Sequence, residues 1–334
     1  MNCKNAIIVS IFLLVLVSCQ KTDRFGMKSA PKIEVKIKRF DKSIISIDTA
    51  NIDSELRKLY KTYPGFMSDY INEVMDENPS DTTAVKKLLL DYLSDTAFVG
   101  VNKKVLEVFA DVSSIEKDIS GAFSGLNYLF PDIKLPEIFF FVSGFNRSVL
   151  KNDNFIAIGS DLFLGSDYSK YAEISYQYLT VNMCRQAVPV DIVSALIYTS
   201  FPNKSNEERL LDLMIYKGKL LFLLSVLLPD TEPQNIMGYT KAKMDWAEKF
   251  EKEIWSSMIE NKHLFSTDTQ LINKYINDAP FTAPVSQESP GRLATWIGWR
   301  IVESYMNTNK STRLQELMKE NDCQKILENS GYKP

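Results

Sequence analysis

The sequence predicts an α+β fold that is mainly helical, in which helices pack on a small central β-sheet. The clearest β signal is an aromatic and β-branched run at residues 138–142, and a second run follows at residues 155–158. The residues between these runs favour turns, and a polar turn follows at residues 159–161. The simplest arrangement is therefore a pair of strands joined by a loop, with helices formed by most of the remaining chain.

The other elements follow from the spacing of apolar residues. Residues 32–40 alternate charged and apolar side chains, which predicts a half-buried strand at an edge of the sheet. Longer segments with apolar residues at helical spacing predict helices. Before the sheet these are residues 53–63, 66–77, 81–93, 103–109 and 115–130. After the sheet they are residues 168–185, 192–199, 207–228, 241–258, 267–275, 293–306 and 311–329.

Size and charge narrow the class of protein. The chain has 334 residues, of which 45% are hydrophobic, so it can build one large domain or two small ones. We expect one mainly helical domain over residues 31–334. The net charge of −3 gives no reason to expect nucleic acid as a partner. The apolar run late in 207–228 has about ten residues, which is too short to cross a membrane.

The first residues have the pattern of a bacterial lipoprotein signal. A short polar start with one lysine precedes the apolar residues 6–17, and the sequence Leu-Val-Ser-Cys then ends at Cys19. This lipobox predicts a signal peptide over residues 1–18, lipid on Cys19 and a polar tether over residues 19–30. Acyl chains such as palmitate would then hold the protein on a membrane. Gln20 follows the cysteine where aspartate commonly retains a lipoprotein at the inner membrane, so we expect the outer membrane, facing the periplasm.

Histidine and cysteine counts exclude several kinds of site. His263 is the only histidine, so the chain has neither an HExxH zinc motif nor a histidine cluster. His263 lies at a predicted helix end, where an interaction with the helix dipole is a simpler role than catalysis. We expect no metal, no cofactor and no catalytic residue. Cys184 and Cys323 remain after processing, and they could pair or stay as separate thiols.

Four residues are candidates for a groove, each with a structural alternative. Asp161 and Asp167 follow the second strand, where they could bind a cation or cap the next turn and helix. Arg292 precedes a core helix and could hold a carboxylate of a peptide or form an internal ion pair. Trp296 could line an exposed groove or pack in the core.

Three stretches occur in the order typical of one family. They are IFFFVSGFN with IAIGSDLFLG, the region from YKGKLLFLLSVLLPD to YTKAKMDWAEKF, and ESPGRLATWIGWRIVESYM with a final SGYKP. Together with the lipobox they resemble the GldB family of gliding-motility lipoproteins of Bacteroidetes. That family is distantly similar to zinc peptidases whose HExxH helix follows the central strands. The corresponding residues 176–186 contain no histidine here, so the resemblance implies a zincin-like fold without its metal site.

The resemblance implies a membrane-anchored, non-enzymatic lipoprotein of the cell envelope. We expect it to act with envelope protein partners in gliding motility or linked protein secretion. The alternative is a periplasmic protein that binds a peptide or lipid in a catalytically inactive groove of metallopeptidase type. A pocket lined by Arg292 and acidic side chains would favour binding, whereas a flat apolar patch would favour assembly with other proteins.

Overall fold

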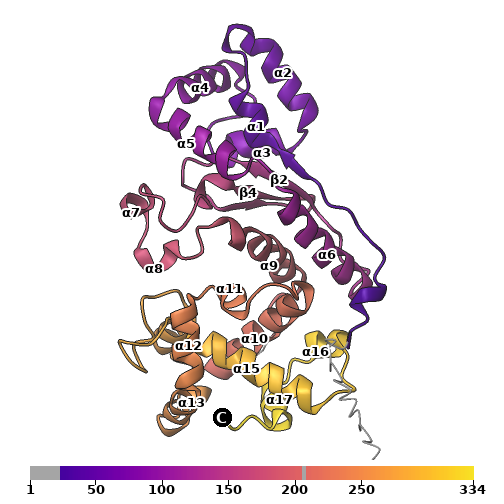
Figure 1. Ribbon diagram of the computed structural model, residues 1–334, viewed down its shortest axis with the longest axis vertical. Helices are drawn as coiled ribbons and strands as arrows, with labels where there is room; N and C mark the ends of the chain where they lie inside the picture. Colours follow the sequence, from indigo (N-terminus) through magenta and orange to yellow (C-terminus); the bar gives the residue numbers. More distant parts are fainter. Residues whose placement is uncertain (1–22, 205–207) are drawn as a thin grey trace, which may run out of the picture.

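A four-stranded sheet separates two groups of helices, as Figure 1 shows. The structure is a computed structural model that describes residues 23–204 and 208–334. Helices α1–α5 lie at one end of the long axis, α6 and α9 lie on the other side of the sheet, and α10–α17 extend to the opposite end. The expected α+β, mainly helical class is confirmed.

The sheet has the strand order β1-β2-β4-β3. Its strands are β1 (Ile37–Arg39), β2 (Glu137–Phe141), β3 (Val149–Lys151) and β4 (Phe155–Gly159). β1 is an edge strand, as expected. β2 and β4 pair with each other, as expected, but they run parallel, so the predicted simple loop between them was wrong. The polar residues that we read as one loop contain β3, which pairs antiparallel with β4 at the other edge.

The parallel pair explains why both central strands are apolar throughout. Ile138 and Phe140 face the large core on the α6 and α9 side, whereas Phe139 and Phe141 face the smaller core under α1–α4. Side chains of a strand alternate between the two faces, and here helices cover both faces. Phe66 of α3 stacks on Phe139 with ring centroids 4.5 Å apart, which fixes the upper helices on the sheet.

Of the helices on the upper side of the sheet and along it, α2, α3, α4 and α6 correspond to predicted helices, whereas α1 was not predicted and α5 begins seven residues earlier than predicted. Asp81, for example, accepts hydrogen bonds from the backbone N–H groups of Thr83 and Ala84 and so caps α4. The six helices are α1 (Phe40–Ile45), α2 (Ile52–Thr62), α3 (Phe66–Glu73), α4 (Thr82–Ser94), α5 (Thr96–Val108) and α6 (Ser113–Leu129).

The second half of the chain departs from prediction in several places. The predicted helix at 241–258 breaks at Phe250 and the predicted helix at 311–329 breaks at residues 320–322. The helices are α7 (Tyr171–Ile174), α8 (Gln177–Thr180), α9 (Val188–Ser200), α10 (Leu210–Leu227), α11 (Pro233–Met237), α12 (Lys241–Lys249), α13 (Glu251–Glu260), α14 (Thr269–Ile276), α15 (Leu293–Thr308), α16 (Leu314–Lys319) and α17 (Cys323–Ser330). Within the described ranges, none of these helices combines the length and apolar character needed to span a bilayer.

The predicted helix over residues 168–185 was wrong. Only the short helices α7 and α8 form there, and Ser175 between them is extended. Tyr171 and Thr180 are buried, but Tyr176 between them is 72% exposed, so the segment lacks a continuous buried face. Because a helix in a protein depends on packing such a face, a long helix is not stabilised here. In Figure 1 this segment projects from the side of the molecule.

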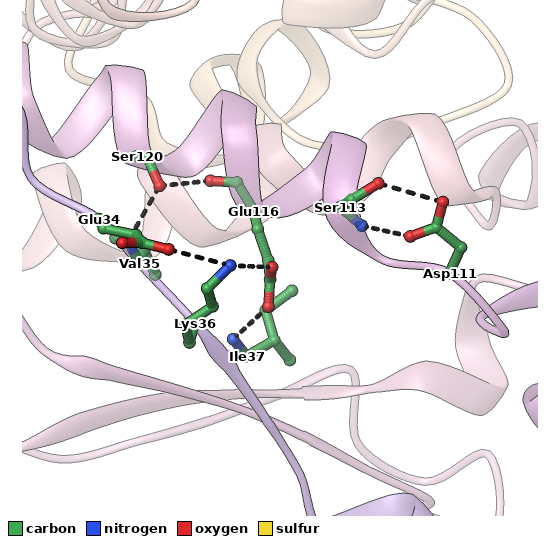
Figure 2. Close-up of polar contacts among 8 residues, drawn as sticks. All are labelled: Glu34, Val35, Lys36, Ile37, Asp111, Ser113, Glu116 and Ser120. Carbon is green, nitrogen blue, oxygen red and sulfur yellow. Dashed lines mark hydrogen bonds and ion pairs between the residues drawn. The ribbon is translucent and has the colours of Figure 1, made fainter.

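The segment before β1 is held by side chains of α6. The backbone N–H groups of Ile33, Val35 and Ile37 donate to Ser124 Oγ, Ser120 Oγ and Glu116 Oε1, at 2.8, 2.9 and 2.9 Å. Figure 2 shows the contacts of Ser120 and Glu116. The bonded residues of α6 are four apart, which is a rise of about 6 Å along the helix. Those of the segment are two apart, which is about 6.6 Å of extended chain, so the two spacings match.

Helices α10 and α15 cross in backbone contact at two glycines. A Cβ atom on Gly298 would lie 1.9 Å from the carbonyl oxygen of Met214, and one on Gly218 would lie 2.3 Å from the backbone of Gly298. No side chain fits between the two helices at this point. Their crossing also places the first turn of α15 beside α9 and α11, where the candidate site lies.

We expect Gly298→Ala to lower the free energy of unfolding by about 3 kcal/mol, because the new methyl group must push apart two packed backbones. Denaturant unfolding followed by circular dichroism measures this. The control is Gly121→Ala in α6, where a Cβ meets nothing within 4 Å. We expect that change to stabilise the protein by about 0.5–1 kcal/mol. Equal behaviour of the two variants would contradict the close helix crossing.

Candidate functional site

Asp161 closes the turn after β2. Its carboxylate accepts hydrogen bonds from the backbone N–H groups of Ser143, at 2.9 Å, and Phe145, at 2.6 Å, and from the Ser143 hydroxyl. Gly144 and Phe145 have φ angles of 70° and 65°, a conformation that is costly for phenylalanine. Burial raises the pKa of Asp161, and these hydrogen bonds oppose that rise. These contacts fit the capping alternative for Asp161. The turn that it caps follows β2, however, and not the second predicted strand.

The other three groove candidates lie in different surroundings. Asp167 is exposed on the loop before α7, and Trp296 is only 1% exposed inside the core. Arg292 Nε lies 3.0 Å from Asp278 Oδ1, and its guanidinium group also donates to the carbonyl oxygen of Met237. Arg292 thus forms an internal ion pair, and of the four candidates it alone lines the cavity described next.

This cavity, of about 140 Å³, lies between α9, α10, α11 and the start of α15. Three polar residues of α9 share the face that borders it: Asp191, Ser194 and Tyr198. Their spacing of three and four residues places them on one side of the helix. Arg292 and Asn182 border the cavity from outside this helix. We call it the Asp191 cavity.

The polar groups of α9 have unused hydrogen-bonding capacity. Among the residues that the structure describes, none forms a hydrogen bond with the side chains of Asp191, Ser194 or Tyr198. Asp191 and Ser194 are half-buried and Tyr198 is 39% exposed, and all three residues line the cavity. Since no described residue bonds with these three side chains, they are free to bond with solvent or with a ligand in the cavity.

Charges around the Asp191 cavity favour an anionic group. Burial raises the pKa of Asp191 to about 7, and the positive charge of Arg292 opposes this rise only partly. Burial, followed by repulsion from Arg292, lowers the pKa of Lys217 and of Lys243. Lys217 Nζ also lies 5.6 Å from the centre of the Tyr198 ring. Three cationic residues and the carboxylate of Asp278, which pairs with Arg292, therefore act on a site in which the carboxyl group of Asp191 can be neutral at pH 7.

Asp191 was missing from our predicted groove, although the sequence carried a signal. We read it only as part of a helix start with Pro189. The helix is otherwise strongly apolar, and polar residues at 191, 194 and 198 form a single stripe along it. Such a stripe in a buried helix indicates a polar cavity or a polar partner. The stripe lines the same cavity as Arg292 because of how α10 and α15 cross, which no local pattern shows.

The remaining histidine and cysteine residues lie outside this cavity. His263 Nδ1 forms a hydrogen bond of 2.9 Å with the hydroxyl group of Tyr275, so it has a structural partner. Cys184 and Cys323 are free thiols, which favours the alternative of two separate cysteines. Burial raises the pKa of Cys323 to about 12. Within the described parts of the chain, no three His, Cys, Asp or Glu side chains converge as metal ligands.

The chain matches a known protein family. A family model described as gliding motility protein GldB matches residues 26–334. The match includes both groups of helices, the sheet and the Asp191 cavity. Neither the curated proteins nor the solved structures gave a match.

We expect Asp191→Asn to change how stability depends on pH. The native chain keeps the Asp191 proton up to about pH 7, whereas an unfolded chain releases it near pH 4. Since the native state binds more protons in this window, wild-type stability falls as pH rises through it. Asparagine cannot ionise, so the variant should gain on the order of 2 kcal/mol relative to wild type from pH 4 to pH 7.

Denaturant unfolding at several pH values tests this expectation. The matched control is Asp167→Asn, which changes an exposed carboxylate. We expect no comparable pH-dependent gain for that control. Parallel pH profiles of wild type and Asp191→Asn would contradict the assigned environment of Asp191.

Proposed function

Because the chain belongs to the GldB family of gliding motility proteins, we propose that it is a membrane-anchored, non-enzymatic lipoprotein component of the gliding machinery in the cell envelope. The observation that carries this proposal is the extent of the family match, residues 26–334. The relationship therefore concerns the whole folded body and not a shared fragment.

Two features support the non-enzymatic role and the anchor. The only histidine is bonded to Tyr275 and lies outside the Asp191 cavity, so it supplies no general base there. The lipobox ending at Cys19 provides the lipid attachment point, and it lies outside the described residues. Lipid on Cys19 would hold the body at a membrane, where envelope protein partners can be reached. Gln20 stands where aspartate commonly retains lipoproteins at the inner membrane, so by analogy we place the anchor in the outer membrane, facing the periplasm.

Replacing Cys19 tests the anchor. We expect Cys19→Ala to abolish labelling with a palmitate analogue and to leave the protein unprocessed or released from the membrane fraction, because the thiol that accepts lipid is gone. Cys3→Ala, which changes the other cysteine of the predicted signal region, should label and fractionate as wild type. Labelling of Cys19→Ala at the wild-type level would refute lipidation at this residue. In a gliding host, colony spreading should be lost with the same variant.

A second function is favoured by the Asp191 cavity, namely binding of a peptide through its terminal carboxylate. The cavity is lined by Arg292 and an acidic side chain, the combination that we associated with binding. Its volume of about 140 Å³ is below the 300–1,000 Å³ typical of pockets that enclose a whole ligand. It can therefore receive the end of a chain. Arg292 and the neighbouring lysines match a carboxylate in charge, and Ser194 offers a hydroxyl donor.

Short peptides with a free or an amidated C-terminus test this second function. We expect the free acid to bind at least about tenfold more tightly than the amide, because only the free acid carries the charge that Arg292 complements. Calorimetry at pH 6 measures both. Ser194→Trp should fill the cavity and abolish binding, while Thr199→Trp on the exposed part of α9 should not. Equal affinity for acid and amide would exclude carboxylate recognition here.

A further inference from the structure

The chain immediately after the predicted anchor is fixed to the body. Arg24 Nη2 donates to the backbone carbonyl oxygens of Asn309 and Lys310, at 3.3 Å each. These carbonyls lie at the C-terminal end of α15, where unpaired carbonyl groups and the helix dipole favour a cation. The Asp23 carboxylate accepts from the backbone N–H groups of Met27 and Lys28, at 2.7 and 2.8 Å, which closes a turn.

Apolar contacts secure the same turn. Phe25 packs edge-to-face on Phe222 of α10, with ring centroids 6.2 Å apart. Met27 lies against Gly125 of α6, where a Cβ atom would come within 2.0 Å of the Met27 methyl group. Only glycine leaves room for Met27 at this position. Residues 23–27, which we expected to be part of a polar tether, thus contact α6, α10 and the end of α15.

The length of chain outside the structure limits the distance to the membrane. Asp23 is four residues after Cys19. Four residues span at most about 14 Å when fully extended. If Cys19 carries lipid at the membrane interface, the surface around Arg24 lies within about 14 Å of the bilayer. A body held this closely cannot rotate freely about its anchor.

The surface around this turn suits a lipid headgroup region. Tyr128, at the end of α6, is 45% exposed and lies beside Gly26. Lys28 and Lys310 are exposed, and no carboxylate of the described residues pairs with either. Tyrosine is typical of the membrane interface, and lysine is attracted by anionic lipids. We call Arg24, Lys28, Tyr128 and Lys310 the anchor surface.

We propose that the anchor surface rests on the phospholipid bilayer, so that the end of the molecule formed by α2 and α4 points away from the membrane. This inference rests on the proposed lipid anchor at Cys19. Figure 1 shows the turn at residues 27–29 on the flank of the molecule near α16, in the lower half of the view, and α2 and α4 at the upper end of the long axis. The docked turn sets this orientation, because it joins the anchor to three separate helices.

A fluorescent reporter on the full lipidated chain tests the orientation. The background is Cys184→Ser, because Cys184 is partly exposed whereas Cys323 is buried. The reporter is placed at Lys310→Cys in the anchor surface or at Lys87→Cys on α4, both exposed positions. The protein is reconstituted into vesicles of phosphatidylethanolamine and phosphatidylglycerol with a nitroxide quencher on some headgroups.

We expect strong loss of fluorescence at position 310 and little loss at position 87. Equal quenching at the two positions, in protein that sediments with the vesicles, would overturn the orientation and leave the anchor standing. Failure of the lipidated protein to sediment with the vesicles would overturn both the anchor and this inference. Sedimentation of each labelled sample therefore separates the two failures.

A tether variant tests the cause of the orientation. Arg24→Ala combined with Met27→Ala removes the bond to α15 and the packing on Gly125. We expect the difference in quenching between positions 310 and 87 to shrink, while sedimentation and circular dichroism stay as in the parent. A difference that persists in this variant would show that the docked turn does not set the orientation.

Discussion

The close approach of α10 and α15 at Gly218 and Gly298 is the constraint on which the second half of the structure depends. Packing of these two helices is the most extensive between any pair of described elements. α10 also contacts α6, α9 and α17, and α15 also contacts α14 and α17. A side chain at either glycine would change the distance between the helices and so the position of everything packed on them. The Asp191 cavity is part of that arrangement, since α9, α10, α11 and Arg292 enclose it.

Local patterns in the sequence were sufficient to predict the fold class and most helices. The apolar stripes of 81–93 and 293–306, for example, correspond closely to α4 and α15. The relative direction of the two central strands was not predictable in this way, because an aromatic strand buried on both faces can run either way beside its neighbour. The helix expected over 168–185 failed for a related reason. Its apolar residues suggested a buried face, and only the folded chain shows that the sheet and α9 leave most of that segment uncovered.

The candidate site could be predicted only in part. Arg292 was a candidate because it precedes a core helix, and it does line the cavity. Asp161 was a candidate because it is a carboxylate at a strand end. Its partners are backbone N–H groups of a turn 16–18 residues earlier in the chain. Such a partner is invisible in a local pattern. Asp191 is of interest for the opposite reason, because its side chain bonds with none of the described residues. That property depends on how the surrounding helices pack, which the sequence does not show.

The three hydrogen bonds between residues 33–37 and α6 have a mechanical consequence. The segment runs antiparallel to α6, since Ile33 bonds Ser124 whereas Ile37 bonds Glu116, and it lies lengthwise along the helix. A pull on the N-terminus, directed along the segment, stretches all three bonds at once and cannot open them one after another. Load from a lipid anchor that passed the docked turn at residues 23–27 would thus be shared in shear by α6 before it reached β1 and the sheet. A protein that connects a membrane to a moving assembly would resist detachment better with this arrangement than with a segment that peels away.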